Sequence, residues 1–411
     1  MSTVLIDLSM LAVTATRTRG IGRHVTDLVR ALGTRAAVGG DGTAILAIER
    51  LPWWGAARVT ADIEGAIGRL TDGAFELSQA AWAYRVRFHL AAAARLSGAE
   101  VVHSPDPDAT PLGRLRCPRV VTCHDLINLM FPGRYTTWRD GWSLGRRRLD
   151  AHRYHHASHV IAVSETTAHE LVARLRVPAR NITVVRNGVD LTRFSPTADA
   201  SDAAVRARCG VGDRPYLLYV GGADWRKNPE GMFDALVRLR RRAGSDAPLL
   251  AWVGRLEGRD LTSVRRLVAA YGIGDAVRLI GWIPDADLAA LARAAVALLF
   301  VSRAEGFGYP VIEAMASGCP VVAGNSPAIA EIAGDAARFV DPERADAIAD
   351  AVATLLRDAS ERRRCIDRGL ARCRAFDVAR MADETLDVYR RVASAGSRRP
   401  RPRDRHLALT S

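Results

Sequence analysis

Short apolar runs alternate with helix-like segments along most of the chain, and this alternation constrains the fold more than any other feature. The runs have the length of buried strands, and the segments between them, such as 82–96, carry apolar residues at helical spacing. Short strands that alternate with helices form parallel sheets, because each parallel connection needs a long crossover. The sequence therefore predicts an α/β protein. The runs expected to form strands are 4–7, 44–48, 101–103, 120–123, 160–163, 182–185, 216–220, 249–253, 277–280, 297–301, 320–323 and 337–340.

These runs fall into two groups, which predicts two domains. Residues 1–195 would form the first domain and residues 214–377 the second. Residues 196–213 begin with Pro196 and are rich in Ala, Asp and Gly, so we expect a linker there, with a ligand cleft beside it. The last residues, 394–411, are charged and interrupted by proline, which predicts a disordered basic tail.

The composition is that of a globular protein. The chain has 411 residues, of which 48% are hydrophobic, enough for two cores. It contains no run of about twenty apolar residues and no cleavable leader, so we expect a cytoplasmic protein. The six cysteines show no Cys-x-x-Cys pairing, which favours reduced thiols over a zinc site.

Lys227 is the only lysine among 58 basic residues. It follows a strand that ends at Gly221-Gly222, and Pro229 opens a helix directly after it. A helix start at the end of a strand attracts anions, because free backbone N–H groups and the helix dipole point there. Arg226 and Lys227 add two charges, which predicts a phosphate-bearing ligand. The alternative is that Lys227 has no special role and is present by chance in an arginine-rich composition.

A second strand end carries Glu305, and Glu313 follows it on a short helix. Two glycines after Glu305 allow a close backbone approach, and Pro310 fits a first helical position. Taken alone, the two glutamates could equally be one loop carboxylate and one solvated helix carboxylate.

The segment from Glu305 to Glu313 resembles the Glu-x7-Glu signature of glycosyltransferase family 4, whose members are retaining, nucleotide-sugar-dependent enzymes and include bacterial mannosyltransferases. Further motifs occur in the family's order, so the resemblance covers about residues 4–393. It implies the GT-B fold, in which two Rossmann-like parallel-sheet domains face a central cleft and a C-terminal helix, here 378–393, crosses back to the first domain. The further motifs are His124-Asp125, Ser164-Glu165, Asn187-Gly-Val-Asp190 and Arg226-Lys227.

The resemblance also implies roles for individual residues. The catalytic residues would be His124 beside the donor sugar, Arg226 and Lys227 on the diphosphate, and Glu305 on the sugar hydroxyls. The donor would further contact Gly20, Gly22, Gly306, Phe307, Gly308 and Glu313, the last of which would accept both ribose hydroxyls.

Arg23 and Asp125 would contact the acceptor. Arg23 could instead be a solvated arginine at a helix start, and His124 could be a histidine whose hydrogen bonds are satisfied by Asp125 or a backbone carbonyl. The chain departs from many relatives at Gly222, where they carry an arginine.

The implied activity is retaining transfer of a hexose from a nucleotide sugar to an acceptor hydroxyl. Family frequency favours mannose from GDP-mannose and a lipid-linked or polysaccharide acceptor. We expect neither cofactor nor metal, because arginine, lysine and helix dipoles can neutralise a diphosphate. Two Asp-x-Asp pairs, at 106–108 and 285–287, are interpreted as turns or helix caps.

The net charge of +13 favours an anionic partner. Arginines interleave with aromatic residues in the segment 138–156, which predicts contact with an anionic membrane surface, although an ordinary basic helix fits equally well. Two other classes of function stay open. The first, nucleic-acid binding, lacks a recognisable module, so we expect no nucleic-acid partner. The second is a non-catalytic GT-B scaffold that serves as a partner subunit.

Overall fold

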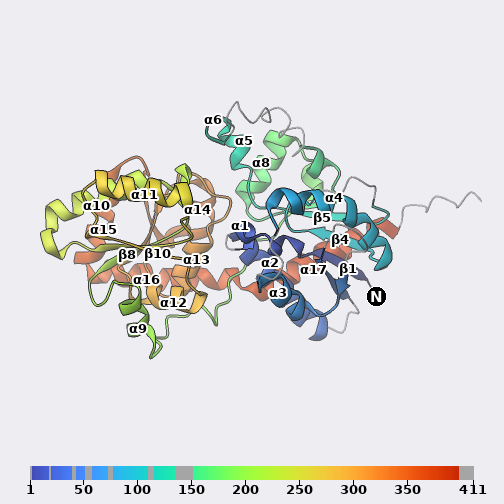
Figure 1. Ribbon diagram of the computed structural model, residues 1–411, viewed down its shortest axis with the longest axis horizontal. Coiled ribbons are helices and arrows are strands. Elements are labelled where there is room, and N and C mark those ends of the chain that lie inside the picture. Colours follow the sequence, from blue (N-terminus) through green and yellow to red (C-terminus); the bar gives the residue numbers. More distant parts are fainter. Residues whose placement is uncertain are drawn as a thin grey trace, which may run out of the picture.

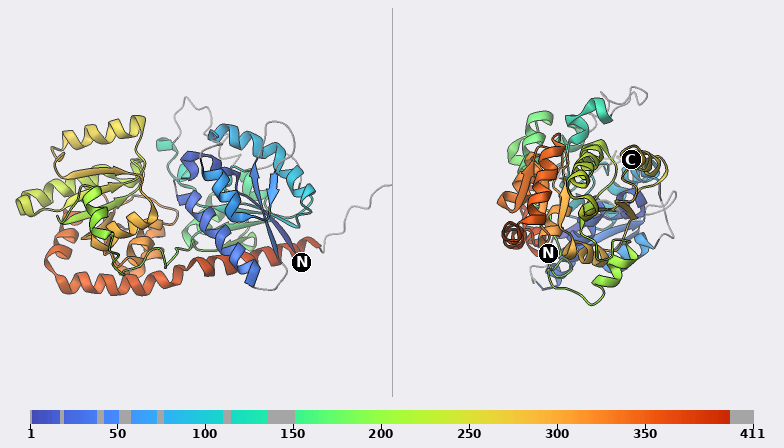
Figure 2. Two further views of the ribbon diagram at one scale, coloured as in Figure 1. Left: turned by 60° about the horizontal axis from the view of Figure 1, so that its bottom comes forward. Right: turned by 90° about the vertical axis from the view of Figure 1, so that its left-hand side faces the viewer.

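The computed structural model describes residues 2–17, 20–38, 43–50, 58–72, 77–109, 115–135 and 151–397. Two α/β domains lie next to each other, and the long helices at the end of the chain run along one side of both (Figures 1 and 2). The predicted two-domain α/β architecture is confirmed.

The first domain is built on a seven-stranded sheet. Its strand order is β3 (Arg58–Thr60), β2 (Ala44–Arg50), β1 (Thr3–Asp7), β4 (Val101–Ser104), β5 (Arg119–Cys123), β6 (His159–Ala162), β7 (Ile182–Val184). Its helices include α1 (Thr14–Arg17), α2 (Gly20–Val38), α3 (Ile63–Thr71), α4 (Gln79–Leu96), α5 (Ile127–Met130), α6 (Pro132–Tyr135) and α8 (Glu165–Leu175). The other strand pairs of this sheet are parallel, as predicted, and only β3, at one edge, runs antiparallel to its neighbour β2.

The second domain has a six-stranded sheet in which all the strands are parallel. The order is β10 (Val277–Gly281), β9 (Leu249–Val253), β8 (Tyr216–Val220), β11 (Ala297–Phe300), β12 (Val321–Gly324), β13 (Ala337–Val340). The helices are α10 (Pro229–Ala243), α11 (Gly258–Ala270), α12 (Asp285–Ala294), α13 (Tyr309–Ala316), α14 (Pro327–Ala333), α15 (Ala345–Arg357) and α16 (Ala359–Cys373).

The strand order places the switch point of this sheet between β8 and β11. The chain leaves β8 toward β9 on one side, and β11 leads to β12 on the other. In such sheets ligands bind outside the carboxyl ends of the two strands that flank the switch point. The two strand ends singled out in the sequence are these two.

The central strands of both sheets are buried on their two faces, which explains the unbroken apolar runs. All the residues of β4, β5, β9, β11 and β12 are buried. Two hydrophobic clusters cover the two faces of the second sheet.

The segment expected to be a linker contains a helix, α9 (Asp202–Arg208), which packs against α12. Arg293 of α12 holds the carboxylate of Asp202 with two hydrogen bonds, of 2.8 and 2.5 Å. The second half of the segment is therefore anchored to the second domain.

The segment 378–393, expected to cross back to the first domain, lies within the helix α17 (Val378–Ser397). It packs along α2, and its apolar residues Met381, Leu386 and Tyr389 belong to the core of the first domain. The left view of Figure 2 shows α16 and α17 following each other beneath both domains.

Two predicted segments lie largely outside the described residues. They are the basic and aromatic segment, of which 138–150 is not described, and the tail, of which 398–411 is not described. Within the described ranges, no helix is long and apolar enough to span a bilayer.

Candidate active site

A one-turn helix, Trp225–Lys227, follows β8 and presents the two predicted diphosphate-binding cations. Asp224 caps this turn by accepting a hydrogen bond of 3.0 Å from the N–H of Arg226. Asn228 ends it in the left-handed conformation, and its buried side chain caps α10 and donates to the carbonyl of Pro342 at 2.6 Å. The loop is therefore held at both ends.

Glu305, which follows β11, forms ion pairs with both Arg226 and Lys227. Arg226 Nη1 lies 2.5 Å from one carboxylate oxygen of Glu305 and Lys227 Nζ lies 2.6 Å from the other. Lys227 Nζ is also 4.8 Å from the centre of the Phe300 ring. Burial alone would raise the pKa of Glu305, but Arg226 and Lys227 outweigh it and lower this pKa to about 2. The carboxylate is therefore ionised, and the structure brings together three of the four predicted catalytic residues.

The loop that follows Glu305 touches the first domain. Ser164 Oγ donates a hydrogen bond of 2.8 Å to the carbonyl of Gly306. A Cβ atom on Gly306 would lie 1.9 Å from the carbonyl oxygen of His124, so only glycine permits this approach. Gly308, with φ of +109°, then begins α13. Ser164 also caps α8.

His124, the fourth predicted catalytic residue, is on the other side of this contact. Its Nε2 lies 2.8 Å from the carbonyl oxygen of Pro105, so this nitrogen carries the proton when the ring is neutral. Burial lowers its pKa, which keeps the ring neutral at pH 7. The buried ring of His24 lies 5.0 Å from the ring of His124. His24 lies on α2 directly after Arg23, and no motif in the sequence pointed to it.

Glu313 is buried on α13 and forms an ion pair with Arg23 of α2. Its second oxygen, Oε2, has no hydrogen-bond partner. Arg23 also contacts Asp285, at 2.5 Å. Arg23 is therefore not the solvated residue of the alternative interpretation, and it lies against the predicted ribose-binding carboxylate. The pKa of Glu313 is raised by burial, although Arg23 opposes this.

The remaining predicted residues surround this core of the site. Asp125 accepts a hydrogen bond from the N–H of Ile127, and its charge raises the pKa of Arg226. A Cβ on Gly20 would meet the Tyr309 ring at 3.5 Å. A Cβ on Gly22 would meet the carbonyl of Arg17. The Phe307 ring packs in the core of the second domain. Gly22 and Phe307 can therefore offer a ligand only their backbone groups.

Both Asp-x-Asp pairs have other partners. Asp285, at the start of α12, binds Arg193 as well as Arg23, and Asp287 binds Arg208 at 2.7 Å. Asp106 accepts a hydrogen bond from the N–H of Asp108 within a turn. The first pair lies in a turn, as expected. The second pair lies in the first turn of α12 but was wrongly expected to cap it, because the N-cap residue is Pro284.

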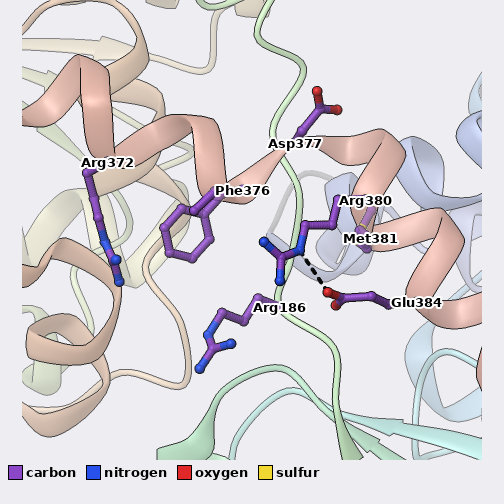
Figure 3. A pocket seen from close by; sticks show the side chains of 8 residues that line it. Arg186, Arg372, Phe376, Asp377, Arg380, Met381 and Glu384 are labelled. Atoms are coloured by element: carbon purple, nitrogen blue, oxygen red, sulfur yellow. Dashed lines mark hydrogen bonds and ion pairs between the residues drawn. The ribbon is translucent and has the colours of Figure 1, made fainter.

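A cavity of about 220 Å³ lies away from these residues, where α17 leaves the second domain (Figure 3). Arg186 and Arg380 point toward it, and Arg380 pairs with Glu384 at 2.8 Å. None of the predicted site residues lines it. The lining residues are Arg186, Arg372, Ala375, Phe376, Asp377, Arg380, Met381 and Glu384.

Comparison with known families agrees with the domain layout. Residues 18–193 match the family model Glycosyltransferase Family 4, and residues 205–372 match Glycosyl transferases group 1. The chain belongs to glycosyltransferase family 4. The boundary between the two matches falls in the segment that was expected to be a linker.

Characterised members of glycosyltransferase family 4 match about half of the chain. The O-antigen chain mannosyltransferase B of Escherichia coli is 29% identical over 231 residues, which are 56% of this chain and 60% of that protein. The MMP alpha-(1->4)-mannosyltransferase of Mycolicibacterium hassiacum is 31% identical over 57% of this chain and 54% of that protein. The matched region thus spans little more than half the length of these relatives.

Solved structures match nearly the whole chain. The sucrose-phosphate synthase of Thermosynechococcus elongatus has a TM-score of 0.72 and 21% identity, and covers 96% of this chain and 100% of that one. Anabaena HepE in complex with UDP-glucose has a TM-score of 0.70 and 16% identity, and covers 95% of this chain and 100% of that one. The chain has the GT-B fold of these structural neighbours.

Proposed function

We propose that this family 4 protein transfers a hexose from a nucleoside-diphosphate sugar to an acceptor hydroxyl. The observation that carries the proposal is the meeting of Arg226 and Lys227, from the end of β8, with Glu305, from the end of β11. These groups lie at the switch point of a parallel sheet, beside the starts of two helices, where a diphosphate is expected to bind.

In the proposed reaction, Arg226 and Lys227 stabilise the diphosphate as it departs with the bonding electron pair. Donors fixed in advance and held away from water are effective there, because charge develops on the leaving oxygen only in the transition state. When the diphosphate takes these cations, the carboxylate of Glu305 becomes available to accept hydrogen bonds from sugar hydroxyls.

Glu313 is proposed to hold the ribose. Its unpartnered Oε2 is ready to accept one ribose hydroxyl, and its other oxygen accepts the second once Arg23 moves away. Asp285 already pairs with Arg23, so Arg23 can keep this ion pair after it has left Glu313.

We propose retention of anomeric configuration. The acceptor oxygen attacks from the face that the diphosphate leaves, and a phosphate oxygen of the leaving group takes the proton from the acceptor hydroxyl. In this proposal the neutral ring of His124 lies beside the anomeric carbon and neither gains nor loses a proton during transfer.

Mannose from GDP-mannose is the proposed donor, and a lipid-linked or polysaccharide hydroxyl the proposed acceptor. Two relatives named mannosyltransferases support this choice. Other relatives are named D-inositol 3-phosphate glycosyltransferase and glycogen synthase, and the HepE structure is a complex with UDP-glucose, so the donor panel must include sugars of other nucleotides. We further propose that the protein works at the cytoplasmic face of an anionic membrane.

The test is a panel of GDP, UDP and ADP sugars. Each is first screened for thermal stabilisation, because a bound ligand raises the apparent melting temperature by mass action. The stabilising donors are then assayed for transfer, with and without a chelator, and the anomeric configuration of the product is read by proton NMR. We expect transfer with retention that persists in the chelator. Stabilisation without transfer to any acceptor or water would contradict the proposed activity, and an inverted product would contradict retention.

A further inference from the structure

Two short helices of the first domain reach the cation-bearing loop of the second. They are α5 and α6, which follow His124 and Asp125 and lie at the top of the first domain in Figure 1. The Phe131 ring is 5.4 Å from the Trp225 ring, and the Arg134 guanidinium is 4.6 Å from the centre of the same ring. The contact therefore crosses from one domain to the other directly beside Arg226.

The loop is also braced from its own domain. Arg303 lies 5.1 Å from the centre of the Trp225 ring and donates to the carbonyl of Trp225 at 2.8 Å. Its backbone N–H donates to the carbonyl of Arg226 at 2.7 Å. These contacts fix the backbone of the loop, but they leave the Arg226 side chain to other partners.

Asp224 is the partner that links this side chain to the first domain. Its Oδ1 accepts a hydrogen bond of 2.6 Å from the hydroxyl of Tyr135. The same oxygen accepts the N–H of Arg226 at 3.0 Å and lies 3.5 Å from Arg226 Nε. A single carboxylate oxygen thus joins a tyrosine of one domain to the proposed diphosphate-binding arginine of the other.

We infer that Tyr135 is a positioning residue, which orients Arg226 for the departing diphosphate by fixing Asp224 from the opposite domain. The inference rests on the proposed function. Glu305 also holds the guanidinium of Arg226, but the diphosphate competes for that interaction when the donor binds. The contact through Asp224 is at the Nε side of the guanidinium, so it can persist during transfer.

The hydroxyl of Tyr135 is suited to this role. Burial and the carboxylate of Asp224 raise its pKa above the ordinary range for tyrosine, so it stays protonated and donates throughout the pH range of an assay. Tyr135 and Asp224, which share this hydrogen bond, belong to different domains. Arg226 is therefore fully aligned only when the domains meet as they do in this structure. Alignment of the arginine is thereby coupled to closure of the two domains.

The test is Tyr135→Phe, which removes one oxygen and keeps the ring. We expect kcat to fall by about tenfold with little change in KM for the donor, because a misaligned cation loses most in the transition state. The matched control is Tyr271→Phe, in which the altered hydroxyl lies in the second domain on the loop after α11; its kcat should equal that of the wild type. Wild-type kcat in Tyr135→Phe would overturn the inference.

A double-mutant cycle separates positioning from general structural support. If Tyr135 acts through Arg226, the substitution Tyr135→Phe has no further effect on kcat in an Arg226→Ala background, and additive losses would overturn the inference. The single variant Arg226→Ala tests the underlying proposal. Full activity of this variant would refute the role given to Arg226, whereas a slow Arg226→Ala with a fast Tyr135→Phe would refute only the positioning role.

Discussion

The side chain of Lys227 is 12% exposed and has two different partners. Its ammonium group lies against the carboxylate of Glu305 and near the face of Phe300. Burial lowers the pKa of Lys227, although Glu305 opposes this. A compact charge fits this place, whereas an arginine fork is wider and needs coplanar partners.

We therefore expect Lys227→Ala to lower kcat by about 100-fold or more, the size of effect seen when one donor to a developing charge is removed. Lys227→Arg should also lose most activity, because the fork displaces the charge. Circular dichroism of both variants should match that of the wild type. A wild-type rate in Lys227→Arg would show that position, rather than residue type, is what matters here.

Glu313 offers a test of the donor site that does not depend on turnover. Glu313→Gln should weaken binding of a nucleoside diphosphate by about 1 to 3 kcal/mol, the range for hydrogen bonds to charged groups. The loss should disappear with a dideoxyribose analogue, and calorimetry of both ligands measures the difference. Equal losses on the two ligands would assign Glu313 a purely structural role, as the partner of Arg23.

At the scale of elements, one side chain can both cap a helix and join the domains. Ser164 accepts the N–H of Thr167 at the start of α8 and donates to the carbonyl of Gly306. Ser78 caps α4 in the same way, by accepting the N–H of Ala81.

Ser164→Ala and Ser78→Ala should therefore each lower the free energy of unfolding by about 1 kcal/mol, the usual cost of an N-cap. Only Ser164→Ala should also lower kcat/KM, because it frees the Gly306 peptide beside the donor site. Denaturant unfolding and steady-state kinetics of the pair measure both effects. Equal kinetics in the two variants would mean that the bond to Gly306 has no part in transfer.

The elements that sequence could predict are those whose signals are local. Strand ends, the helix start at Pro229 and the crossing helix follow from apolar spacing and from proline, and α13 begins at Tyr309, one residue before the predicted Pro310. The strand β3 was missed because it has only three residues, begins with a charged residue and lies at an edge. The helix α9 was hidden by the alanine and aspartate residues that suggested a linker.

The site was predictable to the extent that it follows strand ends. The groups at 226, 227 and 305 meet because neighbouring parallel strands end at one edge of a sheet. The pairing of Arg23 with Glu313, residues 290 positions apart, depends on how the two domains face each other, and no spacing along the chain encodes it. The bond between Tyr135 and Asp224 was missed for the same reason.

On the scale of the whole molecule, the last helix is tied to the first sheet by a buried polar contact. His103 of β4 binds the hydroxyl of Tyr389 through Nδ1 at 2.7 Å and the hydroxyl of Thr122 through Nε2 at 2.8 Å. Burial, with His124 nearby, lowers the pKa of His103 from 6.5 to about 3.

This shift predicts sensitivity to acid. Below pH 6.5 the unfolded chain binds a proton at His103 and the folded chain does not, so its contribution to stability is complete above pH 6.5 and is lost as the pH falls toward 3. The free energy of unfolding should fall by about 1.4 kcal/mol per pH unit more steeply in the wild type than in His103→Gln. His169→Gln, at an exposed position of α8, should keep the wild-type slope. Identical slopes in wild type and His103→Gln would contradict the assignment.

The crossing helix also sets an order for folding during synthesis. Met381, Leu386 and Tyr389 complete the core of the first domain, but the ribosome adds them only after the entire second domain. At about 5 to 20 residues per second, the first sheet waits roughly 10 to 40 s for its last helix after its own strands have been made. The core residues of the second domain all precede α17 in the sequence, so the second domain reaches its native core first. In a growing chain, the N-terminal half is therefore the one that finishes last.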